Sequence, residues 1–213
     1  MLKLYDYFRS SASFRVRIAL NLKQLDYQII PIHLVNNSGE QFSEMYAKLN
    51  PQHLVPALQE GDRILTQSLA IIEYLDEKYV SPPLLPTDSY HKALVRAFAL
   101  VIAADIHPLN NLRVSKYLKN EFKITEEQKN QWYQQWIAQG FTALEKQLVL
   151  YKATGDFCFG DTPTLADICL VPQMYNARRF SCDLSNYPTL VRVDAHCQQH
   201  PAFNKAFPAE TVA

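Results

Sequence analysis

The chain has 213 residues, of which 48% are apolar and 20% charged. A chain of this size and composition can bury a stable core without disulfide bonds or structural metal ions. Its 21 basic and 21 acidic side chains cancel, and no basic block stands out. This balance argues against nucleic acid and against an anionic membrane surface as partners.

The first part of the chain alternates between strand and helix patterns. Short runs rich in apolar, β-branched and aromatic residues predict strands at 3–6, 27–32, 55–59 and 63–66. Apolar residues at helical spacing predict helices at 10–23, 41–49 and 68–79. The order β-α-β-α-β-β-α predicts a thioredoxin-like domain over residues 1–80, in which three helices pack on a four-stranded mixed sheet.

The rest of the chain is predicted to be helical. Three prolines within 81–86 predict a linker over 81–87, because proline removes a backbone donor and biases its predecessor away from helix. Helices are expected at 88–118, 125–151, 164–178 and 188–198. We therefore expect an all-helical domain over 88–213. Thr164 and Asp167 fit a capping box, which predicts a structural role for Asp167.

Several features limit location and cofactors. The longest uninterrupted apolar run, residues 97–104, has 8 residues, far short of the ~18 that span a bilayer. The N-terminus reaches Lys3 too early for a signal peptide. The five glycines form no nucleotide-binding loop, and the four cysteines form no zinc pattern. We expect a cytoplasmic protein with free thiols, no bound metal and no membrane segment.

Three segments place polar groups where the backbone can bind an anion or a peptide. Ser10 and Ser11 stand where a strand hands over to a helix, and unpaired amides there stabilise an anion such as a thiolate. An ordinary serine N-cap is the alternative. Pro56 follows Val55 and cannot continue a strand ladder, which turns the backbone groups of Val55 outward. An extended peptide could therefore pair with Val55 as an added strand. Gln67 and Ser68 begin another helix, whose N-terminus suits a carboxylate.

Together these segments resemble the zeta class of glutathione transferases, which contains maleylacetoacetate isomerase and maleylpyruvate isomerase. The class signature Ser-Ser-Cys-x-Trp-Arg-Val-Arg-Ile-Ala-Leu is matched from Ser10 with two departures. Asn-Pro-x-x-x-Val-Pro and Gln-Ser-x-Ala-Ile-Ile-Glu-Tyr-Leu are matched from Asn50 and Gln67. Further similar segments lie at 105–111, 159–167, 170–173 and 176–180. The resemblance implies the glutathione transferase architecture, a thioredoxin-like domain followed by a helical bundle, and a two-fold homodimer.

The resemblance also implies a glutathione site and assigns residues to it. Ser10 and Ser11 would lie near the sulfur, and Val55 would pair with the cysteinyl backbone. The γ-glutamyl carboxylate would be held by Gln67 and Ser68. The other expected contacts are Gln41 and His53 near the glycyl end, and His107, Asn111, Leu112 and Arg113 from the helical domain. A solvated loop position for His53 and a helix cap for His107 remain the alternatives.

The two departures are Ala12 and Phe14, which stand where the class signature has cysteine and tryptophan. Without the cysteine, no step can use a protein thiol at this position, whereas addition to a double bond needs only the glutathione thiolate.

Three arginines are candidates for binding a substrate carboxylate, because a guanidinium is planar and bidentate. Arg9 flanks the serines, and Arg178 and Arg179 lie near the C-terminus of a predicted helix. The latter two could instead complement the dipole of that helix. Trp132 and Trp136, at helical spacing, are expected to pack in the core or at an interface.

The resulting hypothesis is a glutathione-dependent cis–trans isomerase of maleylacetoacetate or maleylpyruvate, in the breakdown of aromatic amino acids or aromatic acids. Two alternatives stay open. One is a general glutathione transferase for electrophilic or halogenated acids, and the other is a non-catalytic binding or scaffold protein. The sequence does not distinguish the two diacids, which have similar lengths.

Overall fold

The computed structural model describes residues 1–36 and 39–208, and the chain divides into two compact units. The first unit contains Met1–Leu84 and His200–Ala213, and the second contains Leu85–Gln199. This differs from the expected division, which assigned all of 88–213 to the helical domain.

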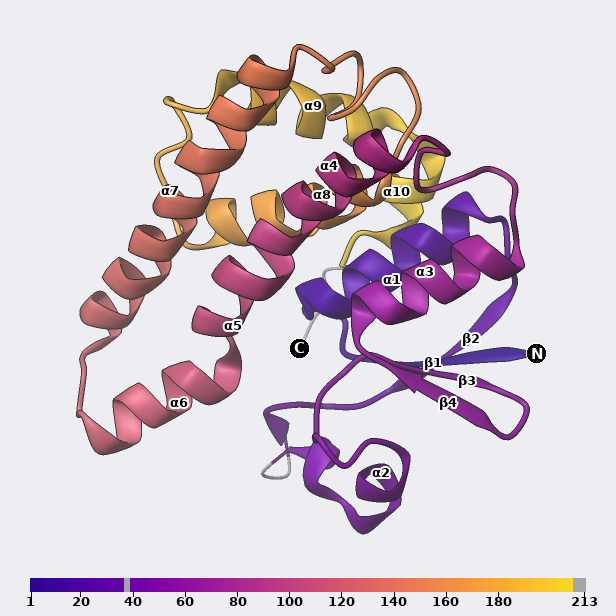
Figure 1. Ribbon diagram of the computed structural model, residues 1–213. Coiled ribbons are helices and arrows are strands. Elements are labelled where there is room, and N and C mark those ends of the chain that lie inside the picture. Colours follow the sequence, from indigo (N-terminus) through magenta and orange to yellow (C-terminus); the bar gives the residue numbers. More distant parts are fainter. Residues whose placement is uncertain (37–38, 209–213) are drawn as a thin grey trace. The chain divides into compact units, whose positions relative to one another are not determined.

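A four-stranded mixed sheet forms the centre of the first unit (Figure 1). Its strands are β1 (Leu2–Asp6), β2 (Tyr27–Pro31), β3 (Ala57–Glu60) and β4 (Arg63–Thr66). The strand order is β2-β1-β3-β4, with β1 parallel to β2 and antiparallel to β3. Leu4 and Leu58 pair across β1 and β3 and are fully buried. The hairpin between β3 and β4 turns at Gly61, whose φ of +59° suits glycine.

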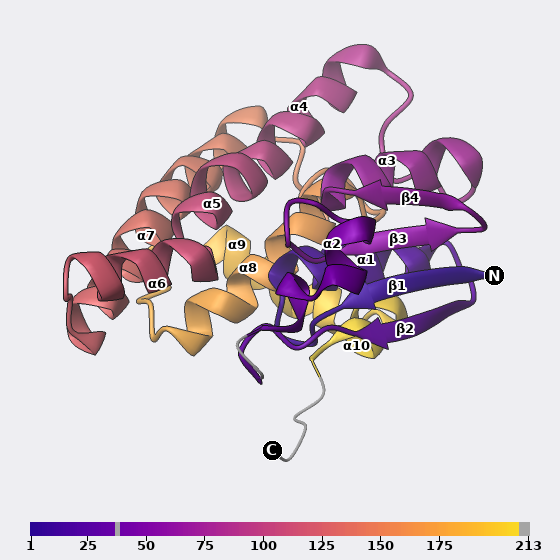
Figure 2. The ribbon, with the colours of Figure 1, turned by 90° about the horizontal axis from the view of Figure 1, so that it is seen from below.

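Helices cover both faces of this sheet. The helices of the unit are α1 (Ser11–Leu22), α2 (Glu44–Leu49), α3 (Ser68–Lys78) and α10 (Pro201–Ala206), with the short η2 (Glu40–Phe42) before α2. Figures 1 and 2 show α1 and α3 on one face and α2 on the other. The expected thioredoxin-like arrangement is confirmed, and only α10 is an addition to it.

A buried guanidinium explains why α10 belongs to the first unit. Arg17 places Nη1 2.7 Å from both carboxylate oxygens of Asp6, and its Nε donates to the carbonyl of Ala206 at 3.0 Å. One turn further along α1, Asn21 donates to the carbonyl of Ala202 at 3.0 Å. These bonds attach α10 to α1 and, through Asp6, to β1.

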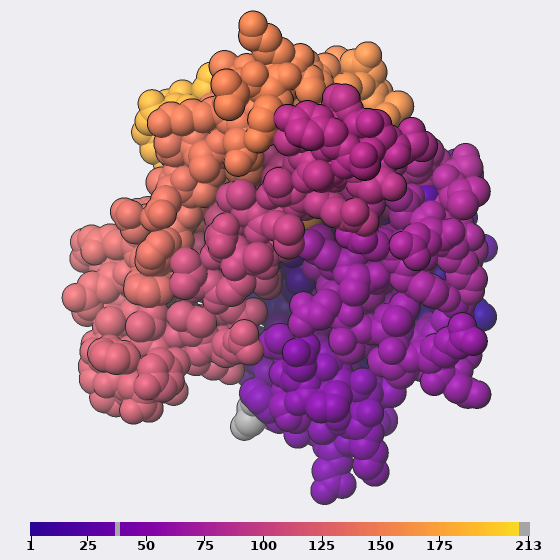
Figure 3. Space-filling model, viewed as in Figure 1, coloured from indigo at the N-terminus to yellow at the C-terminus, as the bar shows by residue number. Residues whose placement is uncertain are grey.

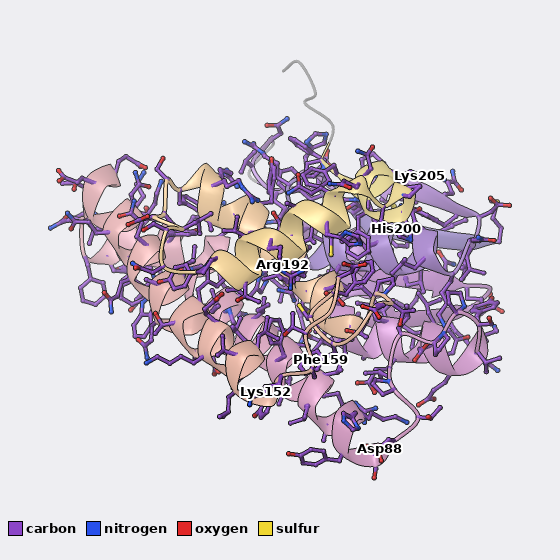
Figure 4. All side chains as sticks on the ribbon, turned by 90° about the horizontal axis from the view of Figure 1, so that it is seen from above. Asp88, Lys152, Phe159, Arg192, His200 and Lys205 are labelled. Atoms are coloured by element: carbon purple, nitrogen blue, oxygen red, sulfur yellow. The ribbon has the colours of Figure 1, made fainter. Side chains whose placement is uncertain are left out.

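The second unit is all helical. Its elements are α4 (Ser89–Leu100), the π-helix η3 (Val101–Ile106), α5 (His107–Leu109), α6 (Leu112–Glu121), α7 (Glu126–Tyr151), α8 (Leu165–Arg179) and α9 (Pro188–Gln199). The buried α8 packs against α4 and α9, and α7 packs against η3 and α9. Asp88, labelled in Figure 4, caps α4 by accepting the N–H of His91 at 2.9 Å.

The first helix expected in this unit, 88–118, is not continuous. In η3 the N–H of His107 donates to the carbonyl of Ile102, five residues back. The next residue, Pro108, has no N–H, and in an α-helix its ring would clash with the carbonyl of Ala104. The wider π turn relieves this clash. The helix then ends, and α6 starts anew with Asn111 as its N-cap.

By length and composition alone, the helical run Ser89–Glu121 could cross a membrane, which the short apolar run of 8 residues did not predict. Mostly buried core helices of soluble proteins meet the same criterion, whereas 28% of the most apolar window of this run is buried. Here Val95, Phe98 and Ile102 are buried in the unit, and Phe98 contacts the ring of Phe159 edge-on at 5.9 Å. Figure 3 shows the outer side of this run at the surface.

Candidate functional site

Ser10 is the N-cap of α1. Its Oγ accepts the N–H of Ser13 at 3.2 Å, so the N-cap interpretation is confirmed. Because a hydroxyl can accept and donate at once, the Ser10 O–H can still donate to an anion. Ser11 is the first residue of α1 and is buried. Both serines therefore lie at the positive end of the α1 dipole, where a thiolate is stabilised.

No cysteine lies in the first unit. Ala12 and Phe14 are both buried in α1, and the four free cysteines are Cys158, Cys169, Cys182 and Cys197 of the second unit. Burial raises the pKa of Cys158, and it raises the pKa of Cys182 to about 11. No side chain of the first unit can therefore supply a thiolate at these serines.

The loop before β3 is held by two hydrogen bonds to one carbonyl. Tyr46 Oη and Asn50 Nδ2 donate to the carbonyl of Leu54 at 2.6 and 2.7 Å. Burial raises the pKa of Tyr46 to about 12, so its hydroxyl stays a donor at neutral pH. Val55 is buried, and the Val55–Pro56 peptide is cis. The backbone of Val55 is thus presented by an anchored turn.

Gln41 and His53, both expected near the glycyl end of glutathione, lie next to each other. His53 has a φ of +55°, and its Nδ1 lies 2.9 Å from the carbonyl of Gln41. A carbonyl can only accept, so Nδ1 carries the proton and Nε2 is the nitrogen left for another partner. Gln41 is buried under Gly39, where a Cβ would come within 2.6 Å of its Oε1.

The N-terminus of α3 contains a feature that sequence reasoning missed. Ser68 is the first residue of α3, and its Oγ accepts from Nη1 of Arg15 at 3.3 Å. Arg15 is only 1% exposed, so a buried positive charge lies beside the helix terminus expected to bind a carboxylate. Gln67, with φ +68°, precedes it and donates to the Gln52 side chain at 2.8 Å. The available signal was an arginine inside a buried, apolar helix.

In the second unit, the remaining candidates lie on one short segment. His107 begins α5, and Asn111 caps α6 by accepting the N–H of Arg113 at 3.1 Å. Leu112 is half-buried and Arg113 is exposed. The segment 107–113 therefore brings these four residues together at the start of α6.

The two adjacent arginines at the end of α8 have different surroundings. Arg178 Nη2 lies 2.6 Å from Oδ2 of Asp194, a fully buried carboxylate. Burial raises the pKa of Asp194, and the Arg178 charge opposes that rise. Arg178 is therefore held by a carboxylate of its own chain, and its expected role toward substrate stays a prediction. Arg179 is exposed, stacks at 5.2 Å over Phe180, and has no ion pair within the described residues.

Arg9 also lacks a carboxylate partner in the part of the chain that the structure describes. It is exposed, donates to the hydroxyl of Tyr7 at 3.0 Å, and lies 5.0 Å from the ring centre of Phe8. Its planar guanidinium is held by aromatic side chains and keeps donors for a ligand.

Comparison with known proteins decides the family. Residues 4–83 match the family profile described as glutathione S-transferase, N-terminal domain, and residues 109–206 match the corresponding C-terminal domain. The chain belongs to the zeta class of the glutathione S-transferase family. A probable maleylacetoacetate isomerase of Vibrio cholerae serotype O1 is 50% identical over 205 residues, covering 96% of this chain and 94% of that protein.

Two solved structures are similar to this zeta-class transferase. A maleyl pyruvate isomerase, described as a bacterial zeta-class glutathione S-transferase, has a TM-score of 0.95 and 47% identity over 97% of both chains. The maleylacetoacetate isomerase of Methylobacterium extorquens AM1, solved with bound malonate and GSH, has a TM-score of 0.93 and 38% identity. It covers 97% of this chain and 96% of that one.

The capping box of this zeta-class chain is structural, as predicted. Asp167 is fully buried and accepts from the backbone N–H groups of Cys158 and Thr164 at 2.7 and 2.8 Å. Burial nonetheless raises its pKa. All of its partners belong to α8 and the preceding loop, so Asp167 anchors α8.

Proposed function

We propose that this transferase catalyses the glutathione-dependent cis–trans isomerisation of a maleyl-type diacid, maleylacetoacetate or maleylpyruvate. The observation that carries the proposal is the pair Ser10 and Ser11 at the N-terminus of α1, a place built to stabilise a thiolate in a unit without cysteine. Relatives named as isomerases of either diacid support it, and so does the relative solved with a diacid and GSH.

The chemistry begins with the glutathione thiol. A free thiol of pKa ~8.5 is mostly protonated at neutral pH. The Ser10 hydroxyl, which already accepts the N–H of Ser13, donates to the sulfur, and the α1 dipole further favours the anion. Ser11 is the second candidate donor. These groups favour the thiolate over the thiol, so the thiol proton is released to water and no protein base of shifted pKa is needed.

The thiolate then adds to one carbon of the cis double bond. A carbon–sulfur bond forms, and the π electrons move to the conjugated carbonyl as an enolate. Rotation about the resulting single bond follows. Collapse of the enolate re-forms the double bond in the trans geometry and expels the thiolate, so glutathione is regenerated and no atom is gained or lost.

Binding groups surround this chemistry. Ser68 and Gln67 hold the γ-glutamyl carboxylate at the α3 N-terminus, beside the buried charge of Arg15. Val55 offers its backbone to the cysteinyl unit. The remaining contacts to glutathione come from Gln41, His53, His107, Asn111, Leu112 and Arg113. Arg9 and Arg179, which lack carboxylate partners among the described residues, bind the distal carboxylate of the diacid.

The test is isomerisation of each purified diacid with and without glutathione, with formation of the fumaryl product followed over time. We expect turnover only with glutathione, and the ratio of the two turnover rates identifies the preferred diacid. Conjugation of neutral electrophiles without isomerisation of either diacid would instead indicate a general transferase. Absence of both activities, together with no retention on glutathione resin, would indicate a binding protein.

We also propose a two-fold homodimer that works in the cytoplasm, in aromatic catabolism. Isologous dimers are the commonest closed assembly, and the outer side of α4 and η3 carries an exposed apolar stripe that a second copy could cover. Its members, at helical spacing, are Ala93, Ala97, Leu100 and Ala104. Four cysteines without a disulfide suit a reducing compartment.

A further inference from the structure

Helix α7 contacts the chain around His107 in two places, one in η3 just before the segment 107–113 and one in α5 within it. The first contact is made at Gly140, a glycine in the interior of a 26-residue helix. The second is made by the indole N–H of Trp132. The segment itself is short, because α5 has 3 residues and follows the π turn of η3. Such a segment depends on its neighbours for its position.

Gly140 allows η3 to approach α7 closely. A Cβ at this position would lie 2.3 Å from Cδ1 and 2.5 Å from Cγ1 of Ile106, well inside van der Waals contact. Ile106 is 1% exposed, so its side chain would have to shift within a packed interior. A glycine inside a helix is less favourable than alanine, and close packing against Ile106 accounts for its presence. Ile106 directly precedes His107.

Trp132 attaches the other end of α5. Its Nε1 donates to the carbonyl of Leu109 at 2.9 Å. Leu109 is the last residue of α5, and terminal carbonyls of a helix lack partners within that helix. Asn110 adds a longer bond from its Nδ2 to the carbonyl of Tyr133, at 3.5 Å. Helix α7 therefore contacts the chain on both sides of His107.

We propose that Gly140 and Trp132 are positioning residues, which hold η3 and α5 so that His107 and the start of α6 meet bound glutathione. The inference rests on the proposed function, which assigns the segment 107–113 to glutathione binding. Binding sites tolerate displacements of only about 0.5 Å, less than the shift that a methyl group at Gly140 would force on Ile106. Neither residue touches the ligand in this account.

A matched pair of tryptophans tests the hydrogen bond. Trp136 lies one turn after Trp132, with ring centres 5.6 Å apart, and its buried Nε1 has no hydrogen-bond partner within the described residues. Trp132→Phe and Trp136→Phe remove the same atoms, but only the first breaks the bond to Leu109. We expect Trp132→Phe to raise the Kd and KM for glutathione about three- to tenfold, with kcat within twofold. Trp136→Phe should leave all three constants unchanged.

A second-site rescue tests the steric contact. Gly140→Ala should raise the Kd for glutathione more than tenfold in calorimetry. Ile106→Ala removes the atoms that the new methyl group would meet, so the double variant should bind glutathione better than Gly140→Ala alone. If Gly140→Ala does not fold, the difference in glutathione affinity between Trp132→Phe and Trp136→Phe still tests the proposal.

Two results would overturn the inference: equal glutathione affinity of the two tryptophan variants, or a double variant no better than Gly140→Ala. Failure of the proposed function is distinguishable from failure of this inference. In that case the wild-type protein would isomerise neither diacid, independently of the glutathione affinities of the α7 variants.

Discussion

Ser10 combines two roles that are usually considered as alternatives. Its Oγ is the acceptor of the N-cap of α1, at 3.2 Å from the nitrogen of Ser13, and its own proton is left for a second acceptor. An N–H that donates to this oxygen polarises the hydroxyl and strengthens its donation to a sulfur anion. The cap and the proposed thiolate contact therefore support each other.

This dual role predicts two separable losses in Ser10→Ala. Loss of the cap should lower the free energy of unfolding by about 1 kcal/mol, and loss of a bond to a charged group should lower the isomerisation rate about 10- to 150-fold. Asp88→Ala, which removes the exposed cap of α4, should cost stability only. If Ser10→Ala and Ser11→Ala both kept the wild-type rate, neither serine would contact the thiolate.

Arg178 and Arg179 provide a second contrast between single residues. Arg179→Lys keeps the charge but loses the planar fork, so the KM for the diacid should rise while the affinity for glutathione stays the same. Arg9→Lys should behave alike. A neutral electrophile, assayed in parallel, should be turned over normally. Equal losses toward diacid and neutral electrophile would mean that these arginines are structural.

Arg178→Met should affect stability instead, and in a pH-dependent way. Burial raises the pKa of Asp194 and Arg178 opposes this rise, so Arg178 stabilises only the ionised carboxylate. Without it the folded-state pKa rises further, and stability is lost as pH increases from the ordinary aspartate range toward that higher value. We expect a deficit of about 1–3 kcal/mol at neutral pH and a smaller one near pH 4. Urea unfolding at several pH values measures it, and a deficit independent of pH would contradict this assignment.

At the scale of elements, a buried ion pair on α1 and β1 contributes to the attachment of α10. The side chain of Arg17 is 6% exposed and that of Asp6 is 5% exposed. Arg17 also donates to the carbonyl of Ala206. The terminal helix is thus fastened to the start of the chain by a side chain of α1.

Removal of that guanidinium should release α10. Arg17→Met leaves a buried carboxylate without its cation, and we expect a loss of about 3–5 kcal/mol in the free energy of unfolding. Amide exchange in α10 should become faster than in α3 of the same variant. Because apolar replacement of both partners is often tolerated, Arg17→Met with Asp6→Leu should recover much of the stability. No recovery would mean that packing of the arginine, rather than charge, is the main contribution.

The whole molecule is proposed to be a homodimer, and the exposed stripe on α4 and η3 gives the test. Leu100, 47% exposed, lies within this stripe. Sedimentation at micromolar concentration should give about twice the chain mass of 24.5 kDa, and Leu100→Lys should shift the protein toward monomer. Val149→Lys, a change at another exposed apolar residue, should have no such effect. A wild-type monomer would contradict the proposal.

Local patterns along the chain determined the elements. The expected helices at 125–151, 164–178 and 188–198 lie within about a residue of α7, α8 and α9, and the capping box of Thr164 and Asp167 was found from its spacing. These features depend on neighbours in sequence, so periodicity and capping reveal them. The motifs that identified the zeta class are equally local.

Tertiary structure alone decided which groups are partners. Arg178 and Arg179 are adjacent and of one type, yet only Arg178 meets the buried carboxylate of Asp194, which lies on another helix. Arg15 and Ser68 come from different helices, and α10 joins the first unit because Arg17 reaches it. An ion pair or a close approach forms between residues distant in the chain, and local pattern contains no information on which distant residue folding will bring into contact.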